Sequence, residues 1–356
     1  MKIKIIKALP KYLKPKPDEK KLGFGQHFTD HMFTMKYREG DGWYDPVIEP
    51  YRYLQLDPTA MCLHYGQEIF EGLKAYRGTN DEIYLFRPLE NIRRMNVSAE
   101  RLCMPPIDET VFLDALKQFV VLEKEWIPRE KGASLYIRPT MIATEPALGV
   151  HPASEYLFFI ICGPVGAYYA HGFGPTKIYV SDDCVRAAPG GTGHVKAAGN
   201  YAASLYASRI ASAMGYTQVL WLDARENRYV EEVGTSNIFF MIGDRLITPP
   251  LGGTILPGVT RDSVLKLAAH LGVKAEESRI AITEVISAIE EGTLRDAFAT
   301  GTAAVISPVG QIFYHNREYL INDGKTGELA EKLYHEILQI QYGLKEDPFG
   351  WRMRIA

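Results

Sequence analysis

Short stretches in which hydrophobic and polar residues alternate recur in the first half of this chain, and a period of two is typical of strands. Between residues 31 and 56 the segments HMFTMKYR and VIEPYRYLQL flank a turn at Gly40-Asp41-Gly42, which predicts strands of an antiparallel sheet. The segment 65–78 continues into a further strand, and 81–86 is predicted to pair with it. Two more strands are predicted at 133–142 and 156–162.

Two segments of the first half have the three- and four-residue hydrophobic spacing of amphipathic helices. The first opens at Arg87-Pro88, with proline at the first helical position, where its missing N–H costs nothing. Its hydrophobic face comprises Ile92, Met95, Ala99 and Leu102. The second helix is predicted at about 108–125, so the first half combines a sheet with two helices.

Helix and strand breakers at 163–169, followed by Gly172, Gly174 and Pro175, mark the best domain boundary. Beyond them the pattern predicts helices at 201–214, 260–271, 282–290 and 327–341, and strands at 176–180, 218–222, 228–231, 237–241, 245–247, 274–279, 296–299 and 303–313. The prediction is an α+β or mixed α/β chain with two domains, 1–166 and 176–356, joined by a linker at 167–175. An N-terminal arm spans about 1–25.

Composition excludes several classes of function. The chain has 356 residues, 46% of them hydrophobic, and a net charge of −3, which gives no electrostatic reason to expect nucleic acid or an anionic membrane as a partner. The longest apolar run, 156–162, is too short to span a bilayer. Four scattered cysteines form no CxxC, so neither a disulfide framework nor a metal site is expected, and a reducing cytoplasm fits best. The basic N-terminus lacks the apolar region of a signal peptide.

One lysine has an unusual environment. Within 186–201 (RAAPGGTGHVKAAGNY), Lys196 is surrounded by Gly, Ala and small polar residues, and no Asp or Glu lies within nine positions on either side. Such neighbours leave clearance for a flat ligand and little charge to keep the lysine protonated, which favours a nucleophile or a base. An ordinary loop lysine is the alternative.

Two turns are candidate phosphate sites. The segment 256–262 (LPGVTRD) places a glycine turn before a helix with Thr260 at or near its N-cap, so backbone N–H groups, the helix dipole and a hydroxyl converge there. The small-residue turn 299–304 (ATGTAA) offers further N–H groups as an anion-binding nest. A plain capped helix and a tight β-turn are the corresponding structural alternatives.

A pair of carboxylates, Glu231 and Glu232, lies between two predicted strands. Strand alternation directs one of them inward, and a buried carboxylate needs a cationic partner. A solvated acidic turn is the alternative. Together with Lys196, the phosphate turns and the hydroxyl of Tyr201, an inward carboxylate would complete the contacts that pyridoxal 5′-phosphate needs. The same residues would also suit a sugar-phosphate enzyme or a non-catalytic binder of phosphate ligands.

Nine segments in order resemble branched-chain amino acid aminotransferases, which are class IV, fold-type IV pyridoxal-phosphate enzymes. They extend from about residue 24 to 342 and read FGQHFTDHMF, YGQEIFEGLKAYRG, LFRPLENIRRM, YIRPTMIATEPALGV, GPVGAYY, GHVKAAGNY, EEVGTSNIFF, LPGVTRDSVL and GTAAVISPVG. The resemblance implies a smaller α/β N-terminal domain and a larger C-terminal domain with a pseudo-barrel of strands flanked by helices. It also implies a homodimer.

The resemblance assigns a role to each site residue. Lys196 would form the Schiff base and shuttle protons, Glu232 would pair with the pyridine nitrogen, and Tyr201 with the phenolic oxygen. The phosphate would be held by Arg94, Val259, Thr260 and Thr302, and the choice of Arg94 over Arg93 comes from the resemblance alone. The substrate pocket would comprise Phe24, Tyr65, Phe70, Tyr136, Arg138, Tyr168, Thr235, Thr302 and Ala303, with Val150 contributed by the partner subunit.

The implied reaction is a reversible, ping-pong transamination. L-Leucine, L-isoleucine or L-valine would pass its amino group to 2-oxoglutarate, giving a branched-chain 2-oxo acid and L-glutamate. Arg138 would accept the side-chain carboxylate of glutamate in a pocket that is otherwise apolar. A D-amino acid aminotransferase and an aminodeoxychorismate lyase share the fold and are the nearest alternatives.

Overall fold

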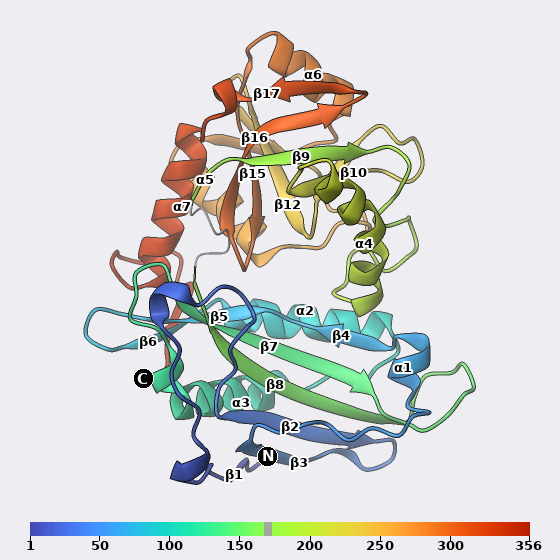
Figure 1. The fold of residues 1–356 in the computed structure, drawn as a ribbon, viewed down its shortest axis with the longest axis vertical. Coiled ribbons are helices and arrows are strands. Elements are labelled where there is room, and N and C mark those ends of the chain that lie inside the picture. Colours follow the sequence, from blue (N-terminus) through green and yellow to red (C-terminus); the bar gives the residue numbers. More distant parts are fainter. Residues whose placement is uncertain (167–172) are drawn as a thin grey trace. The chain divides into compact units, whose positions relative to one another are not determined.

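The computed structural model describes residues 1–166 and 173–356, which group into two compact units (Figure 1). The first unit comprises Met1–Ala170, Val195–Gly199 and Leu338–Ala356, and the second comprises His171–His194 and Asn200–Ile337. The sequence predicts that 338–356 belong to the second domain, whereas in the structure a C-terminal strand pairs with the sheet of the first unit. The first unit therefore contains more residues than the second.

The first unit is built on a sheet whose described strands follow the order β1-β3-β2-β8-β7-β5-β6-β18, with β4 paired to β7. Apart from the parallel β1–β3 pair, neighbouring strands are antiparallel. The predicted β2–β3 pair is confirmed, but β3 ends at Pro50, whereas the pattern extended to residue 56. The strands are β1 (Lys4–Ile5), β2 (His31–Arg38), β3 (Gly42–Pro50), β4 (Glu68–Phe70), β5 (Leu73–Arg77), β6 (Ile83–Phe86), β7 (Ser134–Ala143), β8 (Glu155–Val165) and β18 (Arg352–Arg354).

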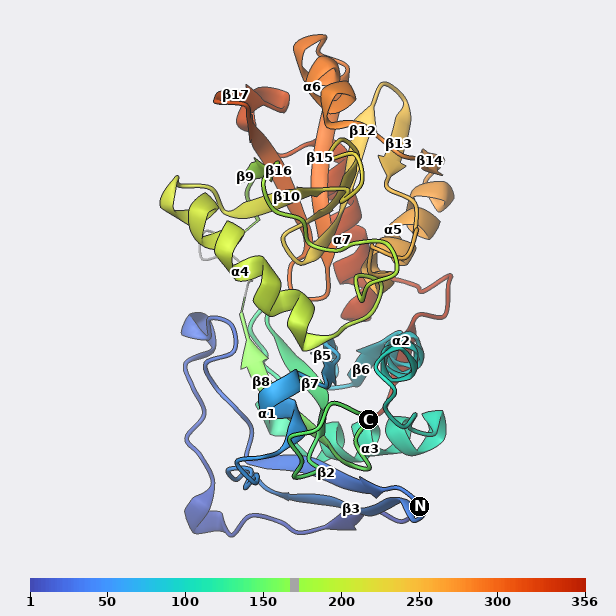
Figure 2. The same cartoon turned by 90° about the vertical axis from the view of Figure 1, so that its right-hand side faces the viewer.

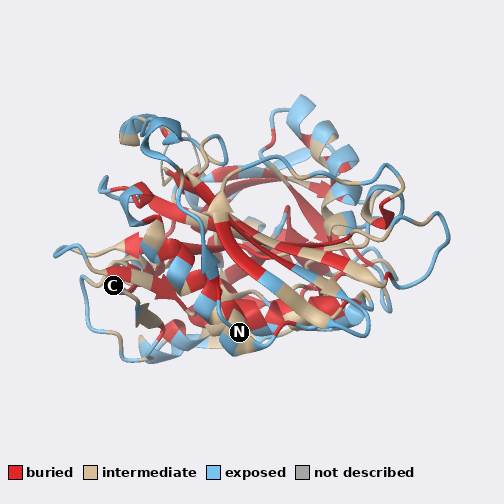
Figure 3. Ribbon diagram, turned by 90° about the horizontal axis from the view of Figure 1, so that it is seen from below, coloured by how far each residue is buried: buried red, intermediate tan, exposed pale blue. Residues whose placement is uncertain are grey.

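Two predicted helices, α2 (Pro88–Arg101) and α3 (Glu109–Leu122), lie side by side against this sheet (Figures 1 and 2). Pro88 occupies the first position of α2, and the Asp108 side chain caps α3 by accepting from two of its first amides. Their apolar faces join the strands in one hydrophobic core, and Figure 3 shows the buried residues concentrated along the strands. Shorter helical segments are α1 (Met61–Tyr65) and the 3₁₀ turns Pro10–Tyr12, Glu19–Lys21 and Lys124–Trp126.

The second unit is built on a sheet in the order β11-β10-β9-β16-β15-β12-β13-β14, and β17 pairs with β16. An additional pairing of β11 with β12 closes the described strands from β11 to β12 into a barrel, which confirms the predicted pseudo-barrel. The strands are β9 (Thr176–Ser181), β10 (Gln218–Leu222), β11 (Val230–Val233), β12 (Ser236–Ile242), β13 (Arg245–Thr248), β14 (Lys274–Glu277), β15 (Leu294–Gly301), β16 (Val305–Tyr314) and β17 (Arg317–Leu320).

The helices predicted for the second half are all present close to their expected positions. They are α4 (Ala198–Ala213), α5 (Val259–His270), α6 (Ile282–Glu290) and α7 (Glu328–Gln341), and a 3₁₀ turn spans Asn322–Gly324. The pattern misses α1, β1, β17 and β18, which are two to five residues long. None of the helices in the described part of the chain has the length and apolar character that crossing a bilayer requires.

Candidate active site

Lys196 belongs to the first unit, although the chain on both sides of its short segment belongs to the second. The segment lies against β4, where Ala197 forms a β-bridge with Ile69 and the Phe70 N–H donates to the Lys196 carbonyl at 3.2 Å. In addition, the Lys196 N–H donates to the Ser98 hydroxyl of α2 at 3.0 Å. Both backbone groups of the lysine are therefore held by the first unit, which fixes the start of its side chain.

The side chain of Lys196 joins a cluster centred on Phe70. Lys196 Nζ lies 4.8 Å from the centroid of the Phe70 ring, and the Arg138 guanidinium carbon lies 4.5 Å from the same centroid, so both cations interact with one ring. Arg138 Nη2 donates to the Tyr136 hydroxyl at 2.9 Å, and the centroids of the Tyr136 and Phe24 rings are 5.0 Å apart. The structure thus brings Lys196 together with four residues predicted to form the substrate pocket.

Strand alternation explains why this cluster is separate from the hydrophobic core. On β7, Leu135 and Ile137 are core residues, so Tyr136 and Arg138 between and beyond them project from the opposite face. Gly72 makes room for the cluster, because a Cβ at this position would lie 2.2 Å from the Tyr136 hydroxyl oxygen. A larger residue at Gly72 would displace the tyrosine that holds Arg138.

Arg94, a predicted phosphate ligand, lies on α2 with 8% exposure and forms a bidentate ion pair with Glu71. Arg94 Nε and Nη2 donate to the two carboxylate oxygens at 2.7 and 2.9 Å, and Asn91 Nδ2 donates to Oε2 at 2.9 Å. Burial raises the pKa of Glu71, but the Arg94 guanidinium, the Lys196 ammonium and the Asn91 amide outweigh it, so the net pKa is lowered. Arg93 is exposed and pairs with surface carboxylates instead.

Two other predicted pocket residues of the first unit, Tyr65 and Val150, lie at exposed positions. Tyr65, at the end of α1, is 40% exposed and donates its hydroxyl to the Leu148 carbonyl. Val150 is 82% exposed in the connection between β7 and β8. Tyr168 lies outside the residues that the structure describes.

In the second unit, both Glu231 and Glu232 on β11 are buried, so the expectation that alternation buries only one of them is wrong. β11 pairs along both edges, and Glu232 lies opposite Asn237, whose Nδ2 donates to it at 3.1 Å. Arg186 supplies the predicted cationic partner, with Nη2 2.6 Å from Glu232 Oε2. Burial raises the pKa of Glu231, while the hydroxyl of Thr254 and the charge of Arg186 act against that rise.

Arg186 also binds two backbone carbonyls, one seven positions away along the chain and one 68 positions away. Its Nη2 donates to the carbonyl oxygens of Gly193, at 2.8 Å, and of Thr254. A Cβ at Gly193 would lie 2.4 Å both from the Ala187 Cβ and from the Thr254 carbonyl oxygen. Gly193 therefore makes room for neighbouring protein atoms. The sequence interpretation had instead expected the small residues around Lys196 to leave clearance for a flat ligand.

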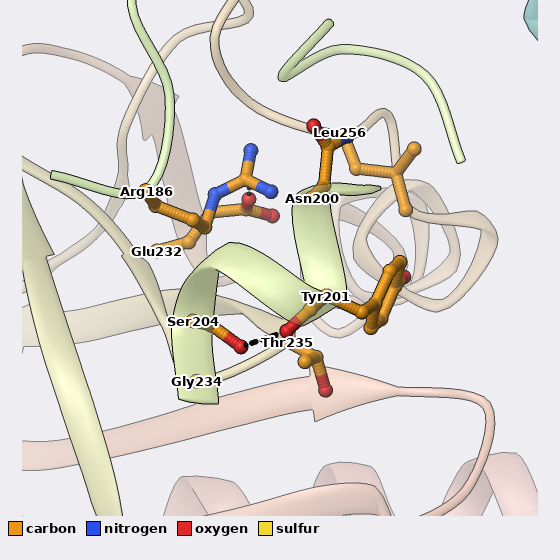
Figure 4. Close-up of a pocket in the computed structure, with 8 residues that line it drawn as sticks. All are labelled: Arg186, Asn200, Tyr201, Ser204, Glu232, Gly234, Thr235 and Leu256. Atoms are coloured by element: carbon orange, nitrogen blue, oxygen red, sulfur yellow. Dashed lines mark hydrogen bonds and ion pairs between the residues drawn. The ribbon is translucent and has the colours of Figure 1, made fainter. Parts of the chain in front are cut away.

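A pocket of the second unit gathers three of the predicted residues (Figure 4). In Figure 4 the Glu232 carboxylate faces the Arg186 guanidinium, and the Tyr201 ring is directed away from that pair. Arg186 was not predicted, although the need for a cation beside a buried carboxylate could have pointed to it. The lining residues are Arg186, Asn200, Tyr201, Ser204, Glu232, Gly234, Thr235 and Leu256.

The first predicted phosphate turn is the start of α5. Gly258 is the N-cap, so Val259 and Thr260 are the first two helical residues and the Thr260 hydroxyl does not cap the helix. Gly258 is required by packing, because a Cβ there would lie 2.1 Å from Asn237 Oδ1. The amides of the first helical turn have no acceptor within the helix, and the dipole favours an anion at this end.

The second predicted phosphate turn, containing Thr302 and Ala303, is the hairpin between β15 and β16, closed by the pair Gly301 and Val305. Val305 adopts φ 63°, a left-handed conformation that is uncommon for a β-branched residue. Strained backbone of this kind is concentrated at ligand sites. The segment is therefore a tight turn of half-buried residues between two strands.

Comparison with known proteins identifies the class to which these residues belong. Residues 68–312, more than half of the chain, match the family model described as amino-transferase class IV. This chain therefore belongs to the class IV aminotransferases.

Its relatives narrow the class to one family. The chain is 54% identical over 343 residues to branched-chain-amino-acid aminotransferase 2 of Bacillus subtilis (strain 168), covering 96% of this chain and 94% of the relative. The structure resembles the branched-chain amino acid aminotransferase of Escherichia coli, with a TM-score of 0.75 and 26% identity over 92% of this chain and 99% of that one. It also resembles the branched-chain aminotransferase of the thermophilic archaeon Thermoproteus uzoniensis with norvaline, with a TM-score of 0.74 and 25% identity over 91% and 100% of the two chains. The family is that of the branched-chain-amino-acid aminotransferases, as the sequence resemblance predicted.

Proposed function

We propose that this enzyme reversibly transfers the amino group of L-leucine, L-isoleucine or L-valine to 2-oxoglutarate with pyridoxal 5′-phosphate as cofactor, in a ping-pong cycle. The observation that carries the proposal is the cluster around Phe70. Lys196 and the cation Arg138 share the Phe70 ring, and Arg138 is in turn held by Tyr136, whose ring packs against Phe24. An apolar side chain can pack against the rings, and a side-chain carboxylate can pair with the guanidinium.

The residues present fit the cofactor. In the second unit, Glu232 is 2% exposed and held beside a guanidinium, so a carboxylate is available for a protonated ring nitrogen. The α5 N-terminus and the hairpin at Thr302 suit a phosphate, and in the first unit a buried Arg94 suits it as well. When bound, pyridoxal phosphate supplies an electron-accepting ring conjugated to the substrate nitrogen. In the proposal its phosphate is held by Arg94, Val259, Thr260 and Thr302, its ring nitrogen by Glu232 and its phenolic oxygen by Tyr201.

The proton transfers belong to this chain's own residues. Lys196 Nζ removes the proton from the substrate Cα and later returns one, which requires its neutral form at that moment. The N–H groups of Thr302 and Ala303 bind the α-carboxylate and so orient the Cα–H bond toward Nζ. Glu232, held 2.6 Å from the Arg186 guanidinium, would accept a hydrogen bond from the protonated ring nitrogen and so hold its proton. In the proposal the substrate side chain is bound by Phe24, Tyr65, Phe70, Tyr136, Tyr168 and Thr235.

A homodimer completes the proposal. Val150 lies at the exposed tip of the β7–β8 connection, and we assign it to the substrate pocket of a second copy of this chain. The enzyme is assigned to the cytoplasm, in keeping with four cysteines that are free thiols. Light scattering of the purified protein should give the mass of two chains, and a monomer with full activity would contradict the shared pocket.

A kinetic panel tests the proposed function. Leucine, isoleucine, valine, glutamate and D-alanine are each offered with a suitable 2-oxo acid, and aminodeoxychorismate is offered alone. The proposal expects turnover of the three branched-chain donors and of glutamate. Turnover restricted to D-alanine, or release of pyruvate from aminodeoxychorismate, would replace it with one of the two related activities.

A further inference from the structure

A buried hydrogen-bonded chain in the first unit connects the two groups to which the proposed function assigns the cofactor's phosphate and aldehyde. The Arg94 side chain donates to Glu71 at 2.7 Å, the Ser98 hydroxyl donates to the Arg94 carbonyl at 3.0 Å, and the Lys196 N–H donates to that hydroxyl at 3.0 Å. Glu71 and Ser98 both have 0% exposure. Neither residue is therefore placed to bind a ligand itself, and both contact a residue that is.

Glu71 determines how Arg94 is presented. The Glu71 carboxylate accepts hydrogen bonds from Nε and Nη2 along one edge of the Arg94 guanidinium. It also accepts from Asn91 Nδ2 and from the Gly72 amide, the latter at 3.0 Å. A planar guanidinium that is held in two places along one edge cannot rotate, so its Nη1 side has one direction. The orientation of Arg94 toward an anion is therefore set by Glu71.

Ser98 determines where Lys196 begins. A helix serine commonly donates to the carbonyl four residues earlier, and Ser98 does so to Arg94. Its oxygen here also accepts the amide of Lys196 from a distant part of the chain. Together with the Phe70 N–H, which donates to the Lys196 carbonyl, this bond fixes the backbone from which Nζ projects.

Resting on the proposed function, we propose that Glu71 and Ser98 are positioning residues with separable tasks. Glu71 aims Arg94 at the phosphate and so acts on non-covalent binding of the cofactor. Ser98 places Lys196 for covalent capture of the aldehyde. In that step neutral Nζ bonds to the aldehyde carbon, and the aldehyde oxygen takes both Nζ protons and leaves as water.

The experiment separates the two tasks with two probes on apoprotein. Pyridoxamine 5′-phosphate has the phosphate and no aldehyde, so its dissociation constant from fluorescence quenching reports binding alone. Saturating pyridoxal 5′-phosphate, followed by visible absorbance in a stopped-flow instrument, reports the rate of capture by Lys196. The variants are Glu71→Gln, Ser98→Ala and, as a control on the exposed face of the same helix, Arg93→Gln.

Glu71→Gln should weaken pyridoxamine phosphate binding by about tenfold or more, because the Arg94 guanidinium is no longer oriented toward the phosphate. Ser98→Ala should leave that dissociation constant within about twofold and slow capture by roughly three- to tenfold, because the nucleophile is no longer placed. Arg93→Gln should match the wild type in both. Unchanged binding in Glu71→Gln overturns the first task, and wild-type capture in Ser98→Ala overturns the second.

A double variant guards against a folding defect. Glu71→Gln leaves a buried guanidinium without its counter-charge, whereas Arg94→Gln with Glu71→Gln leaves no charge unpaired. If Glu71 acts through Arg94, adding Glu71→Gln to Arg94→Gln should not weaken binding further, and a fully additive loss would contradict it. Failure of wild type and Arg93→Gln to bind either compound would refute the proposed function itself, and this outcome differs from a failure confined to the variants.

Discussion

Each unit of this enzyme contains an arginine–glutamate ion pair whose side chains are at most 9% exposed, and the two pairs are built in opposite ways. In the first unit Glu71 has 0% exposure and is surrounded by protein donors, while Arg94 is the partner assigned to the ligand. In the second unit Arg186 is occupied by two backbone carbonyls, while Glu232 is the partner assigned to the ligand. The same ion pair thus presents a cation in one unit and an anion in the other.

The two supporting partners differ in how fully the protein uses them: both carboxylate oxygens of Glu71 accept hydrogen bonds, whereas Arg186 bonds through Nη2 and its buried Nε has no hydrogen-bond partner among the described residues. Glu71 accepts from a guanidinium, a side-chain amide and a backbone N–H. The Arg94 guanidinium, the Lys196 charge and the Asn91 amide lower its pKa despite burial. Arg186 gives Nη2 to carbonyl oxygens as well as to Glu232. A group whose hydrogen-bonding capacity is used by the protein has little left for a ligand, and its charge serves to hold its neighbour.

The largest effect is expected at the anion of the second unit. Glu232→Gln keeps the size of the side chain and removes the charge that would hold a proton on the cofactor ring. We expect kcat to fall by roughly 100-fold or more, about 3 kcal/mol in the barrier. The adjacent buried Glu231→Gln is the matched control and should stay near wild type, since Glu231 binds Thr254. Equal losses in both variants would show a general packing effect.

The next effect is expected at the cation of the first unit. Arg94→Gln should weaken binding of pyridoxal phosphate by about 10- to 100-fold, because one charge-assisted phosphate contact is lost. At saturating cofactor, kcat should change far less than in Glu232→Gln. Cofactor titration of the apoprotein measures the loss, with Arg93→Gln as control. A variant of Arg94 that binds the cofactor normally would remove this arginine from the phosphate site.

A smaller and substrate-selective effect is expected at Arg138. Arg138→Gln should raise the KM for glutamate by about tenfold and leave the KM for leucine nearly unchanged, because only glutamate brings a second carboxylate. Steady-state kinetics with both donors measure the split. Retention of full activity with glutamate together with loss of leucine turnover would contradict this division of labour.

The fold was largely predictable from sequence, because long strands and helices display their periods, whereas the site was predictable only in part. Lys196 and the two glycine-containing turns are recognisable from local composition. A buried carboxylate at 231–232 also predicts a cationic side chain beside it, without saying which one. Glu71 could not be found in this way, because its partner Arg94 lies 23 positions away and meets it only through the packing of α2 on β4. Likewise, only resemblance to the family separates Arg94 from Arg93 before burial is known.

Another buried carboxylate, Asp296, is expected to influence the stability of the fold and not the activity. Asp296 on β15 is 3% exposed and accepts from backbone amides, including that of Ala330 at 2.8 Å. Burial raises its pKa from 3.8 to about 6, although those amides oppose the rise, in contrast to the lowered pKa of Glu71. The Arg94 guanidinium beside Glu71 accounts for the lowered pKa of that carboxyl.

The sign of the pH dependence follows from that raised pKa. Between about pH 4 and pH 6 the folded protein binds more protons at Asp296 than the unfolded chain does. The free energy of unfolding therefore falls as pH rises through this window, by on the order of 2–3 kcal/mol. Asp296→Asn keeps an acceptor for the amides and should flatten that part of the profile. Urea denaturation at several pH values measures it, and an unchanged slope would contradict the assignment.

In the proposed function Lys196, held by the first unit, is the residue that bonds to the cofactor. Reduction of the holoenzyme with borohydride, followed by proteolysis and mass spectrometry, tests it directly. The account predicts loss of the visible absorbance and one phosphopyridoxyl label, on the peptide that contains Lys196. A label on another lysine, such as the buried Lys74, or a colourless protein that takes up no label, would contradict it.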